Sequence, residues 1–244
     1  MTYCVGLCVA EGLVLLSDTQ TNAGLDNISR FTKMFTFERP GERVLALMTC
    51  GNLSITQGVV SRLERKIQEA AADPALESIL NADSMARVAQ LVGTELQRVQ
   101  AAYSEPIRRA GATADASLLL AGQRRGGQPR LFLIYSAGNF IEATRDTPFF
   151  QIGETKYGKP ILDRIITPDT SIDLALKTVC ISMASTLMSN LSVGMPLDLA
   201  VIRKDALAFA TRRRIERDDP GFAAVSQAWS VAIRKGVEGL PSLM

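Results

Sequence analysis

The order of strand-like and helix-like segments limits the fold of this chain more than any other feature of its sequence. Strand-like segments come first, two amphipathic helical segments follow, strands return, two more helical segments follow, and a late strand comes next. A parallel doubly wound sheet requires strands and helices in regular alternation, which this order lacks. The order instead favours an α+β protein in which antiparallel sheets stack on one another and helices cover their outer faces.

Runs of aliphatic and β-branched residues, separated by turn residues such as Pro40 and Gly41, define the strands. The predicted strands are residues 3–10, 13–16, 33–37, 43–49, 116–121, 131–135, 139–142, 149–152 and 197–202. The first two form a hairpin around the turn at Glu11 and Gly12.

Apolar residues at helical spacing predict the helices. Long helices are expected after Asn52, after Asp83 or Ser84, and after Ser171, because each of these residue types can cap a helix N-terminus. A short helix is expected near Glu154 and a last one over residues 222–237.

Charge and composition exclude several classes of partner. The formal net charge is +2, so no strong field would draw the chain to nucleic acid or to an anionic membrane. The basic run 212–214 is short and acidic residues follow it, which is typical of a solvated surface. No apolar segment approaches the length of a membrane span, and no secretory signal is visible. Because no repeat or linker interrupts the chain, we predict one domain over residues 1–244, with a C-terminal extension from about residue 206.

The cysteine spacing and the histidine content limit which metal sites and catalytic mechanisms this chain can have. The four cysteines form no C-x-x-C pair, so no zinc site or disulfide framework is indicated, and a reducing cytoplasm is the expected location. The sequence contains no histidine. Ser–His–Asp and Cys–His mechanisms and histidine metal ligands are therefore excluded. A hydrolase built from this chain must move protons with a lysine, a carboxylate or its own terminal amine.

Thr2 is the first candidate catalytic residue. Initiator methionine is usually trimmed when the second residue is small, and trimming would give Thr2 both a hydroxyl nucleophile and a free α-amine. An α-amine titrates near pH ~8, so a useful fraction of it is a neutral base. An N-terminal amine can activate the hydroxyl of the threonine that carries it. Many proteins begin with Met-Thr, so this signal is weak alone.

Asp18 and Lys33 strengthen the signal. Asp18 ends the strand that pairs with the N-terminal strand, so the tight turn between them brings it toward Thr2, and Lys33 opens the next strand. A buried ammonium near Thr2 would lower the pKa of the hydroxyl and of the amine, and Asp18 would hold Lys33 in position. The alternative interpretation is that both are ordinary surface residues.

Gly51 is the third element of the pattern. It follows the strand that ends at Thr49 and precedes the helix capped by Asn52. Its N–H group therefore lies near a helix N-terminus, where backbone donors are unsatisfied and negative charge is favoured. Such a donor can stabilise the oxyanion of acyl transfer. A glycine is also expected there simply to make the tight turn.

Together these residues resemble a proteasome β-type peptidase. The resemblance rests on Thr2, on the segment 16–24 (Leu-Ser-Asp-Thr-Gln-Thr-Asn-Ala-Gly), on Lys33 and on the segment 49–52 (Thr-Cys-Gly-Asn), and it runs to roughly Asp205. Within that family the chain is most similar to the bacterial ancestral β-subunit group, called Anbu, because of its start (Met-Thr-Tyr-Cys-Val) and its long C-terminal extension.

The resemblance implies a four-layer αββα sandwich, assembly of identical subunits into rings or ring-like oligomers, and no metal or organic cofactor. It assigns the nucleophile and amine to Thr2, the carboxylate to Asp18, the ammonium to Lys33 and the oxyanion amide to Gly51, and it retains Ser192. It also places Thr21 and Asn22 beside an extended peptide substrate and Thr49 in the wall of its pocket. An unfoldase partner is neither indicated nor excluded.

Two departures from the family pattern concern the surroundings of the terminal amine. Proteasome β subunits have Gly-Ser-Gly where this chain has residues 153–155 (Gly-Glu-Thr), so Glu154 replaces a serine. They have an aspartate three residues before the serine that corresponds to Ser192, where this chain has Ser189. Glu154 could restore a carboxylate to the site.

We therefore expect an N-terminal threonine peptidase that hydrolyses peptide amide bonds after loss of Met1. Two other functions stay open. A chain that keeps Met1 would be a catalytically silent ring subunit, and the same fold could serve a small-molecule amidohydrolase.

Overall fold

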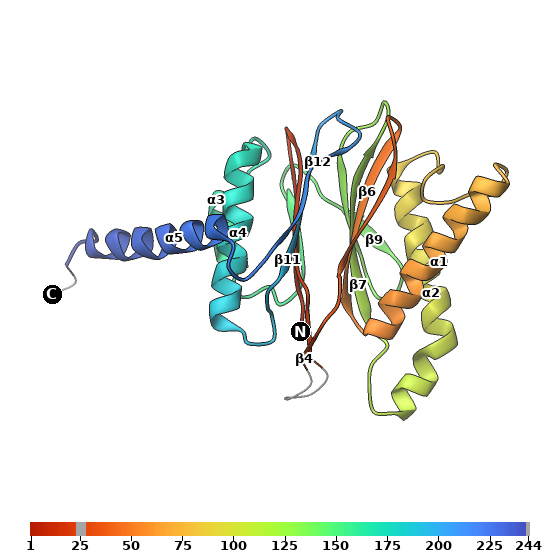
Figure 1. Cartoon of the computed structure of the whole chain (residues 1–244), viewed down its shortest axis with the longest axis horizontal. Coiled ribbons are helices and arrows are strands. Elements are labelled where there is room, and N and C mark those ends of the chain that lie inside the picture. The colour runs from red at the N-terminus through yellow and green to blue at the C-terminus, as the bar shows by residue number, and fades with distance from the viewer. Residues whose placement is uncertain (23–27, 243–244) are drawn as a thin grey trace.

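Two five-stranded sheets lie face to face in this protein, and helices cover the outer face of each (Figure 1). The computed structural model describes residues 1–22 and 28–242 of the chain. Strands pair antiparallel throughout both sheets. The predicted α+β class and the four-layer αββα sandwich of two antiparallel sheets flanked by helices are confirmed.

The first sheet has the order β10-β1-β2-β11-β12. Its strands are Phe149–Gly153 (β10), Tyr3–Val9 (β1), Gly12–Asp18 (β2), Leu197–Arg203 (β11) and Phe209–Ile215 (β12). The second sheet has the order β5-β6-β7-β8-β9. Its strands are Met34–Arg39 (β5), Arg43–Gly51 (β6), Ala116–Arg124 (β7), Arg130–Ile134 (β8) and Phe140–Glu142 (β9). A separate pairing joins Gln20–Asn22 (β3) to Ile28–Arg30 (β4).

The helices form the two outer layers. Those over the first sheet are Lys159–Ile165 (α3) and Ile172–Ser189 (α4), and those over the second are Leu53–Ala72 (α1) and Met85–Arg109 (α2) (Figure 1). The last helix, Pro220–Glu238 (α5), leaves the sandwich beside α4.

Successive side chains of β2 point to opposite faces of the first sheet and pack in two different layers. Leu13 and Leu15 pack between the two sheets, whereas Val14 and Leu16 pack against the helical layer that contains α4. Because both faces are covered, every residue of β2 is buried. This explains why the segment reads as a nearly continuous apolar run in the sequence.

Three predicted helix caps are confirmed. The Asn52 side chain accepts from the backbone N–H groups of Ser54 and Ile55 at the start of α1, and Ser84 and Ser171 cap α2 and α4 in the same way. Each cap satisfies donors that the first helical turn leaves without a partner. The cap at Asn52 fixes α1 directly after β6, so the helix begins next to Gly51.

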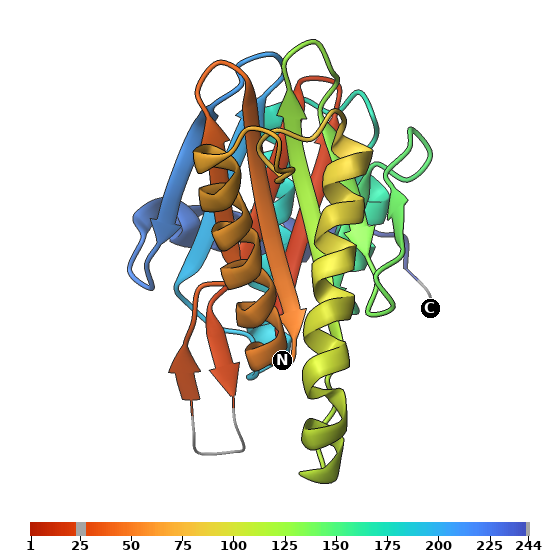
Figure 2. The same cartoon turned by 90° about the vertical axis from the view of Figure 1, so that its right-hand side faces the viewer.

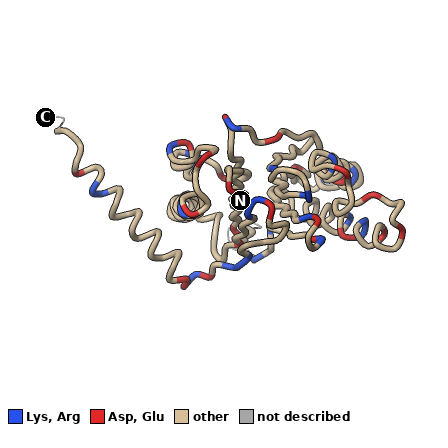
Figure 3. The backbone as a smooth tube through the Cα atoms, turned by 90° about the horizontal axis from the view of Figure 1, so that it is seen from above, with Lys and Arg blue, Asp and Glu red and all other residues tan. Residues whose placement is uncertain are grey.

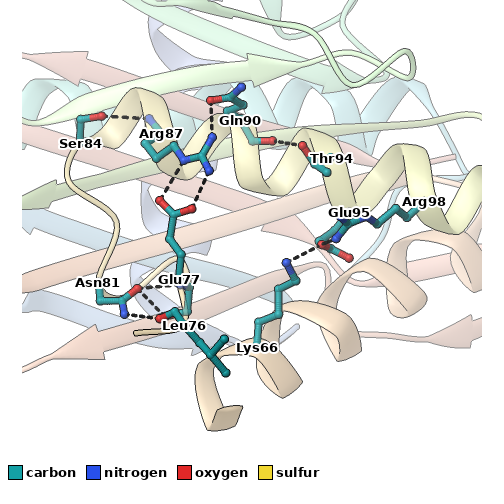
Figure 4. Close-up of polar contacts among 11 residues, drawn as sticks. Lys66, Leu76, Glu77, Asn81, Ser84, Arg87, Gln90, Thr94, Glu95 and Arg98 are labelled. Carbon is teal, nitrogen blue, oxygen red and sulfur yellow. Dashed lines mark hydrogen bonds and ion pairs between the residues drawn. The ribbon is translucent and has the colours of Figure 1, made fainter. Parts of the chain in front are cut away.

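A buried carboxylate joins α1 to α2. Glu95 of α2 is only 1% exposed. Its oxygens lie 2.6 Å from Arg62 Nε. They also lie 3.0 Å from Lys66 Nζ and 2.6 Å from Arg98 Nη1 (Figure 4). Burial of a carboxylate is tolerated here because cations surround it.

Several boundaries differ from the sequence prediction. The short helix expected near Glu154 begins at Lys159, because Gly158 provides its N-cap position and Pro160 fits its first turn. The strands β3, β4 and β12 were not predicted. Two of them have three residues each, and β12 contains three consecutive exposed arginines, which hide any strand pattern. The basic run inside β12 is exposed, as expected of a solvated surface.

Helix α5 projects away from the sandwich, as seen from the side and from above (Figures 1 and 3). None of its residues is buried. The predicted extension from about residue 206 therefore contains two different parts, because β12 completes the first sheet and only the helix that follows it leaves the body of the fold.

The expectation that no segment approaches the length of a membrane span is wrong by length and apolarity. Helix α4 has 18 residues and is apolar enough to cross a membrane, the one such helix among residues 1–22 and 28–242. Its residues Ile172, Val179 and Met183 are buried against the first sheet, which is the packing of a core helix.

Candidate active site

The hairpin of β1 and β2 brings Asp18 to the start of the chain. Cys4 pairs with Ser17, so Asp18 lies across from Tyr3 at the open end of the hairpin. The Tyr3 N–H group donates to Asp18 Oδ1 at 3.0 Å. Asp18 is 0% exposed. The predicted approach of Asp18 to the N-terminus follows directly from this register.

Lys33 reaches the same carboxylate from the other sheet. Its Nζ lies 2.7 Å from Asp18 Oδ1 and also donates to the Gln20 carbonyl at 2.6 Å. The backbone of Lys33 is fixed as well, because the Thr49 N–H donates to its carbonyl at 2.9 Å. Lys33 is 4% exposed, so the interpretation of Lys33 and Asp18 as ordinary surface residues is wrong.

Several donors converge on Asp18. Gly194 N–H donates to Asp18 Oδ2 at 3.3 Å, in addition to the bonds from Tyr3 and Lys33. Burial raises the pKa of the Asp18 carboxyl above its ordinary value, while the Lys33 ammonium and the two amides oppose that shift. These three donors fix the Asp18 carboxylate, which in turn orients the Lys33 ammonium.

A cavity of about 310 Å³ lies above this pair. The predicted site residues that line it are Thr2, Thr21, Lys33, Thr49 and Gly51. In Figure 2 the N-terminus lies between β3–β4 on one side and the C-terminal half of α2 on the other. Side chains that are far apart in the sequence therefore meet around one space large enough for a substrate group.

Gly51 ends β6 with φ at +109°, a conformation that side-chain-bearing residues rarely adopt. A Cβ there would lie 2.2 Å from the Asp115 carbonyl oxygen. The turn alone therefore requires glycine. The same turn puts Gly51 at the cavity wall, next to the start of α1. Gly51 can therefore be both the glycine that the turn requires and a backbone donor for an oxyanion.

Thr2 is held by a neighbouring strand that sequence reasoning did not connect to it. Tyr3 pairs with Gly153 of β10, and the Glu154 N–H donates to the Thr2 carbonyl at 2.7 Å. A Cβ on Gly153 would lie 2.0 Å from that carbonyl oxygen. Gly153 is therefore a site residue that the prediction missed. The resemblance had aligned residues 153–155 near the amine, which was the available signal.

Cys50 also lines the cavity and contacts Thr2. Burial raises the pKa of the Cys50 thiol, while Lys33 and a side-chain hydrogen bond from Thr2 lower it to a lesser extent. The thiol is therefore less able to form a thiolate than an ordinary cysteine. Since the chain also has no histidine to activate a thiol, Cys50 is a poor candidate for the nucleophile.

Two predicted residues lie away from the cavity lining or outside the described part. Ser192 is half-buried in the loop after α4, where its N–H donates to Asn190 Oδ1 at 2.9 Å, and it is absent from the residues that line the cavity. The backbone of Asn22 pairs with Ile28 in β3–β4, but its side chain lies outside the described residues. Ala23 and Gly24 of the resemblance also lie outside them.

Comparisons with known proteins identify the family. No protein-family model matches the sequence, and no curated protein matches it either. Anbu from Yersinia bercovieri superposes with a TM-score of 0.92 at 43% identity, over 100% of this chain and 99% of that chain. The chain belongs to the Anbu family.

Two further Anbu structures agree. Anbu from Pseudomonas aeruginosa, solved as a helical assembly of the Anbu complex, matches with a TM-score of 0.93 at 44% identity, over 100% of this chain and 98% of that one. Anbu from Hyphomicrobium sp. strain MC1 matches with a TM-score of 0.91 at 41% identity over 100% of both chains. Anbu stands for ancestral β-subunit, so the resemblance to that group and the proteasome-like fold are confirmed.

Metal-binding side chains do not cluster in the part of this Anbu chain that the structure describes. Within the described part of the chain, no group of three or more histidine, cysteine, aspartate or glutamate side chains is placed to hold a metal ion. The buried cation next to Thr2 is instead the Lys33 ammonium.

Proposed function

We propose that this Anbu chain is a threonine-type peptidase whose nucleophile is Thr2 after removal of Met1. The observation that carries the proposal is the buried Lys33–Asp18 pair beside a cavity that Thr2 lines. Burying an ammonium costs free energy of folding. Buried ionisable groups with perturbed pKa values cluster at functional sites.

In the proposed first stage, the neutral α-amine of Thr2 takes the hydroxyl proton as Oγ1 forms a bond to the substrate carbonyl carbon. The Gly51 N–H stabilises the resulting oxyanion. The C–N bond then breaks, the ammonium returns the proton to the leaving amine, and an ester to Thr2 remains. In the second stage a water molecule, activated by the same amine, adds to the ester and releases the carboxylic acid.

Lys33 acts electrostatically in this scheme. Its ammonium favours negative charge on Oγ1 and lowers the pKa of the neighbouring α-amine. Asp18 keeps the ammonium in place through the 2.7 Å ion pair. Neither side chain needs to exchange a proton with substrate.

The proposed substrate is an extended peptide or unfolded protein. The backbone of β3, with Thr21 and Asn22, is available near the cavity to pair with an extended chain, as in β-augmentation. Thr49 and the apolar side chain of Leu53 form part of the pocket wall.

The proposed working state is a homo-oligomer, ring-like or helical, in a reducing cytoplasm. The Pseudomonas aeruginosa relative was solved as a helical assembly. The four cysteines of this chain are free thiols, which fits such a location. Whether an unfoldase feeds the assembly is a separate question.

Peptide turnover by two matched proteins tests the proposal. One begins at Thr2, released from a cleavable N-terminal fusion, and the other carries Thr2→Ala in the same format. We expect the first to hydrolyse peptides and the second to be inactive. Equal turnover by both would exclude Thr2 as the nucleophile.

The silent ring subunit and the small-molecule amidohydrolase give different results in the same assay. While Met1 is attached, the nitrogen of Thr2 is an amide and cannot serve as base. An intact mass that retains Met1 in the cell, with no turnover, would therefore support the silent subunit. Turnover of small amides but not of peptides would support the amidohydrolase.

A further inference from the structure

Three acidic side chains among the described residues are buried: Asp18, Glu95 and Glu154. A carboxylate removed from water destabilises the fold unless a cation or several donors compensate. Asp18 has the Lys33 ammonium, and Glu95 has three cations between α1 and α2 (Figure 4). Glu154 is the exception that calls for an explanation.

Glu154 is 8% exposed and has only neutral partners. The Lys156 N–H donates to its Oε1 at 2.9 Å, and Asn190 Nδ2 donates to its Oε2 at 3.0 Å. Within the described residues, no lysine or arginine forms an ion pair with it. Each oxygen accepts one of these bonds and keeps capacity for a further donor.

Glu154 lies directly across from the chain start. The pairing of Tyr3 with Gly153 continues by one step, and the Glu154 N–H donates to the Thr2 carbonyl at 2.7 Å. Because the carbonyl and the nitrogen belong to the same residue, this bond fixes the backbone of Glu154 close to the Thr2 nitrogen. Loss of Met1 would turn the nitrogen of Thr2 into an ammonium, which is a new cation opposite the buried carboxylate.

The loop after α4 connects both carboxylates of this region. Asn190 donates to Glu154, and its Oδ1 accepts from Ser192 N–H, while Gly194 N–H of the same loop donates to Asp18. Glu154 and Asp18 are thus fixed on either side of residues 2 and 3 by one short segment.

We propose that Glu154, held by Asn190, is the counter-ion and positioning residue for the α-ammonium of Thr2 once Met1 is removed. The inference rests on the proposed function, since it assumes that processing occurs. Before processing, Glu154 is a buried carboxylate without a cation. After processing, it orients the amine and offsets the repulsion from Lys33.

Charged and titratable groups from every neighbouring strand surround the start of the chain. They are Asp18 from β2, Lys33 before β5, Cys50 from β6 and Glu154 after β10. Lys33 disfavours the protonated amine, whereas Glu154 and Asp18 favour it. Removing the charge of Glu154 must therefore lower the pKa of the Thr2 amine.

The test uses the full chain released with Thr2 as its first residue and ¹⁵N-labelled threonine, so that the α-amine pKa is read from the ¹⁵N shift during a pH titration. Glu154→Gln is expected to lower this pKa by about one unit, a tenfold change in the protonation equilibrium. Glu216→Gln removes the same charge from an exposed position and is expected to leave it unchanged. Asn190→Ala removes the amide that holds the Glu154 carboxylate and is expected to lower it by a smaller amount.

An amine pKa that is the same in wild type, Glu154→Gln and Asn190→Ala would overturn the inference. If Glu154→Gln does not fold, the Asn190→Ala titration decides alone, with an unchanged amine pKa as the contrary result. Peptide turnover is measured on the same samples. Absence of turnover with a shifted amine pKa would refute the proposed peptidase while leaving the counter-ion in place, so the two failures are distinguishable.

Discussion

At the residue scale, Lys33 is the side chain whose position folding alone explains least. Its ammonium lies among packed strands, 4% exposed, where an apolar residue would stabilise the fold more simply. The ammonium donates to Asp18 Oδ1 and to the Gln20 carbonyl, and Lys33 lines the same cavity as Thr2. Placing a charge there has a cost in stability, which is expected where a site is built for chemistry.

A double-mutant cycle measures how much the Lys33–Asp18 pair contributes to the free energy of unfolding. Lys33→Met leaves Asp18 as a buried carboxylate without a cation, so we expect a loss of about 3–5 kcal/mol in the free energy of unfolding. Asp18→Asn combined with Lys33→Met removes both charges, and we expect a smaller loss than for Lys33→Met alone. Urea unfolding measures both. A loss below about 1 kcal/mol for Lys33→Met would contradict the burial argument.

The sequence predicts Thr2, Asp18, Lys33 and Gly51 as neighbours because each is tied to a local signal: the chain start, a strand end, a strand start or a strand-to-helix turn. Gly153 and the Asn190 contact to Glu154 carry no such signal. They depend on the pairing of β1 with β10, which joins residues about 150 positions apart in the chain. Local periodicity contains no information about that pairing.

At the element scale, the site is built from strand ends. Asp18 ends β2, Gly51 ends β6 and Gly153 ends β10, so three strand C-termini meet at the cavity. Glycine is needed at two of these ends because the backbone of a neighbouring strand passes too close for a Cβ. The positions of Thr2 and of the Gly51 amide therefore depend on tight backbone packing.

Gly153→Ala tests this dependence. The new Cβ would meet the Thr2 carbonyl carbon and oxygen, so Thr2 must move, and we expect at least a tenfold slower reaction of Thr2 with a substrate or electrophile. Gly126→Ala is the matched control, since Gly126 also has positive φ but open space around it. Gly126→Ala should lose about 1 kcal/mol of stability from backbone strain, and Gly153→Ala should lose more because its Cβ also clashes with the Thr2 backbone. Unchanged reactivity of Gly153→Ala would contradict the proposed geometry.

The cap of α1 makes a second element-scale prediction. Asn52→Ala removes a cap whose side chain also donates to the Thr113 carbonyl at 2.9 Å, next to Gly51. Ser84→Ala removes the corresponding cap of α2, whose N-terminus lies away from the cavity lining. Both are expected to lose about 1 kcal/mol in urea unfolding. Only Asn52→Ala should slow the reaction of Thr2 with a substrate or electrophile. Equal reaction rates in the two variants would mean that the cap does not position Gly51.

The sequence predicts long elements better than short ones. Helices with caps and a full apolar stripe, such as α1 and α4, begin where their N-caps indicate. The three-residue strands β3 and β4 have no periodicity to recognise, and β12 is an edge strand with charged residues on its exposed face. Tertiary pairing, not local propensity, makes these segments strands.

At the scale of the whole molecule, α5 is the helix that contributes no buried residue to the fold of the single chain. It projects from the sandwich and has no buried residue (Figure 3). Val231, Ile233 and Val237 are 49%, 46% and 62% exposed, although such residues are usually buried. An exposed apolar helix of this kind is typical of a contact between subunits.

Removal of residues 220–244 is therefore expected to reduce the oligomer size in sedimentation velocity. The first sheet should stay folded, because β12 ends at Ile215 and α5 contributes no buried residue. Far-UV circular dichroism of the truncated chain checks the fold. The same oligomer size with and without these residues would show that α5 is not a subunit contact.

The central claim is that Thr2 carries both the nucleophile and its base. A peptide epoxyketone has two electrophilic carbons, so it can bond to a hydroxyl oxygen and to an amine of one residue. Peptide mapping by tandem mass spectrometry, after reaction with the protein that begins at Thr2, is the most direct measurement. We predict a single adduct on residue 2 attached through both Oγ1 and the α-nitrogen, and none when Met1 is retained. An adduct on Cys50 or elsewhere, or no adduct on Thr2, would contradict the account.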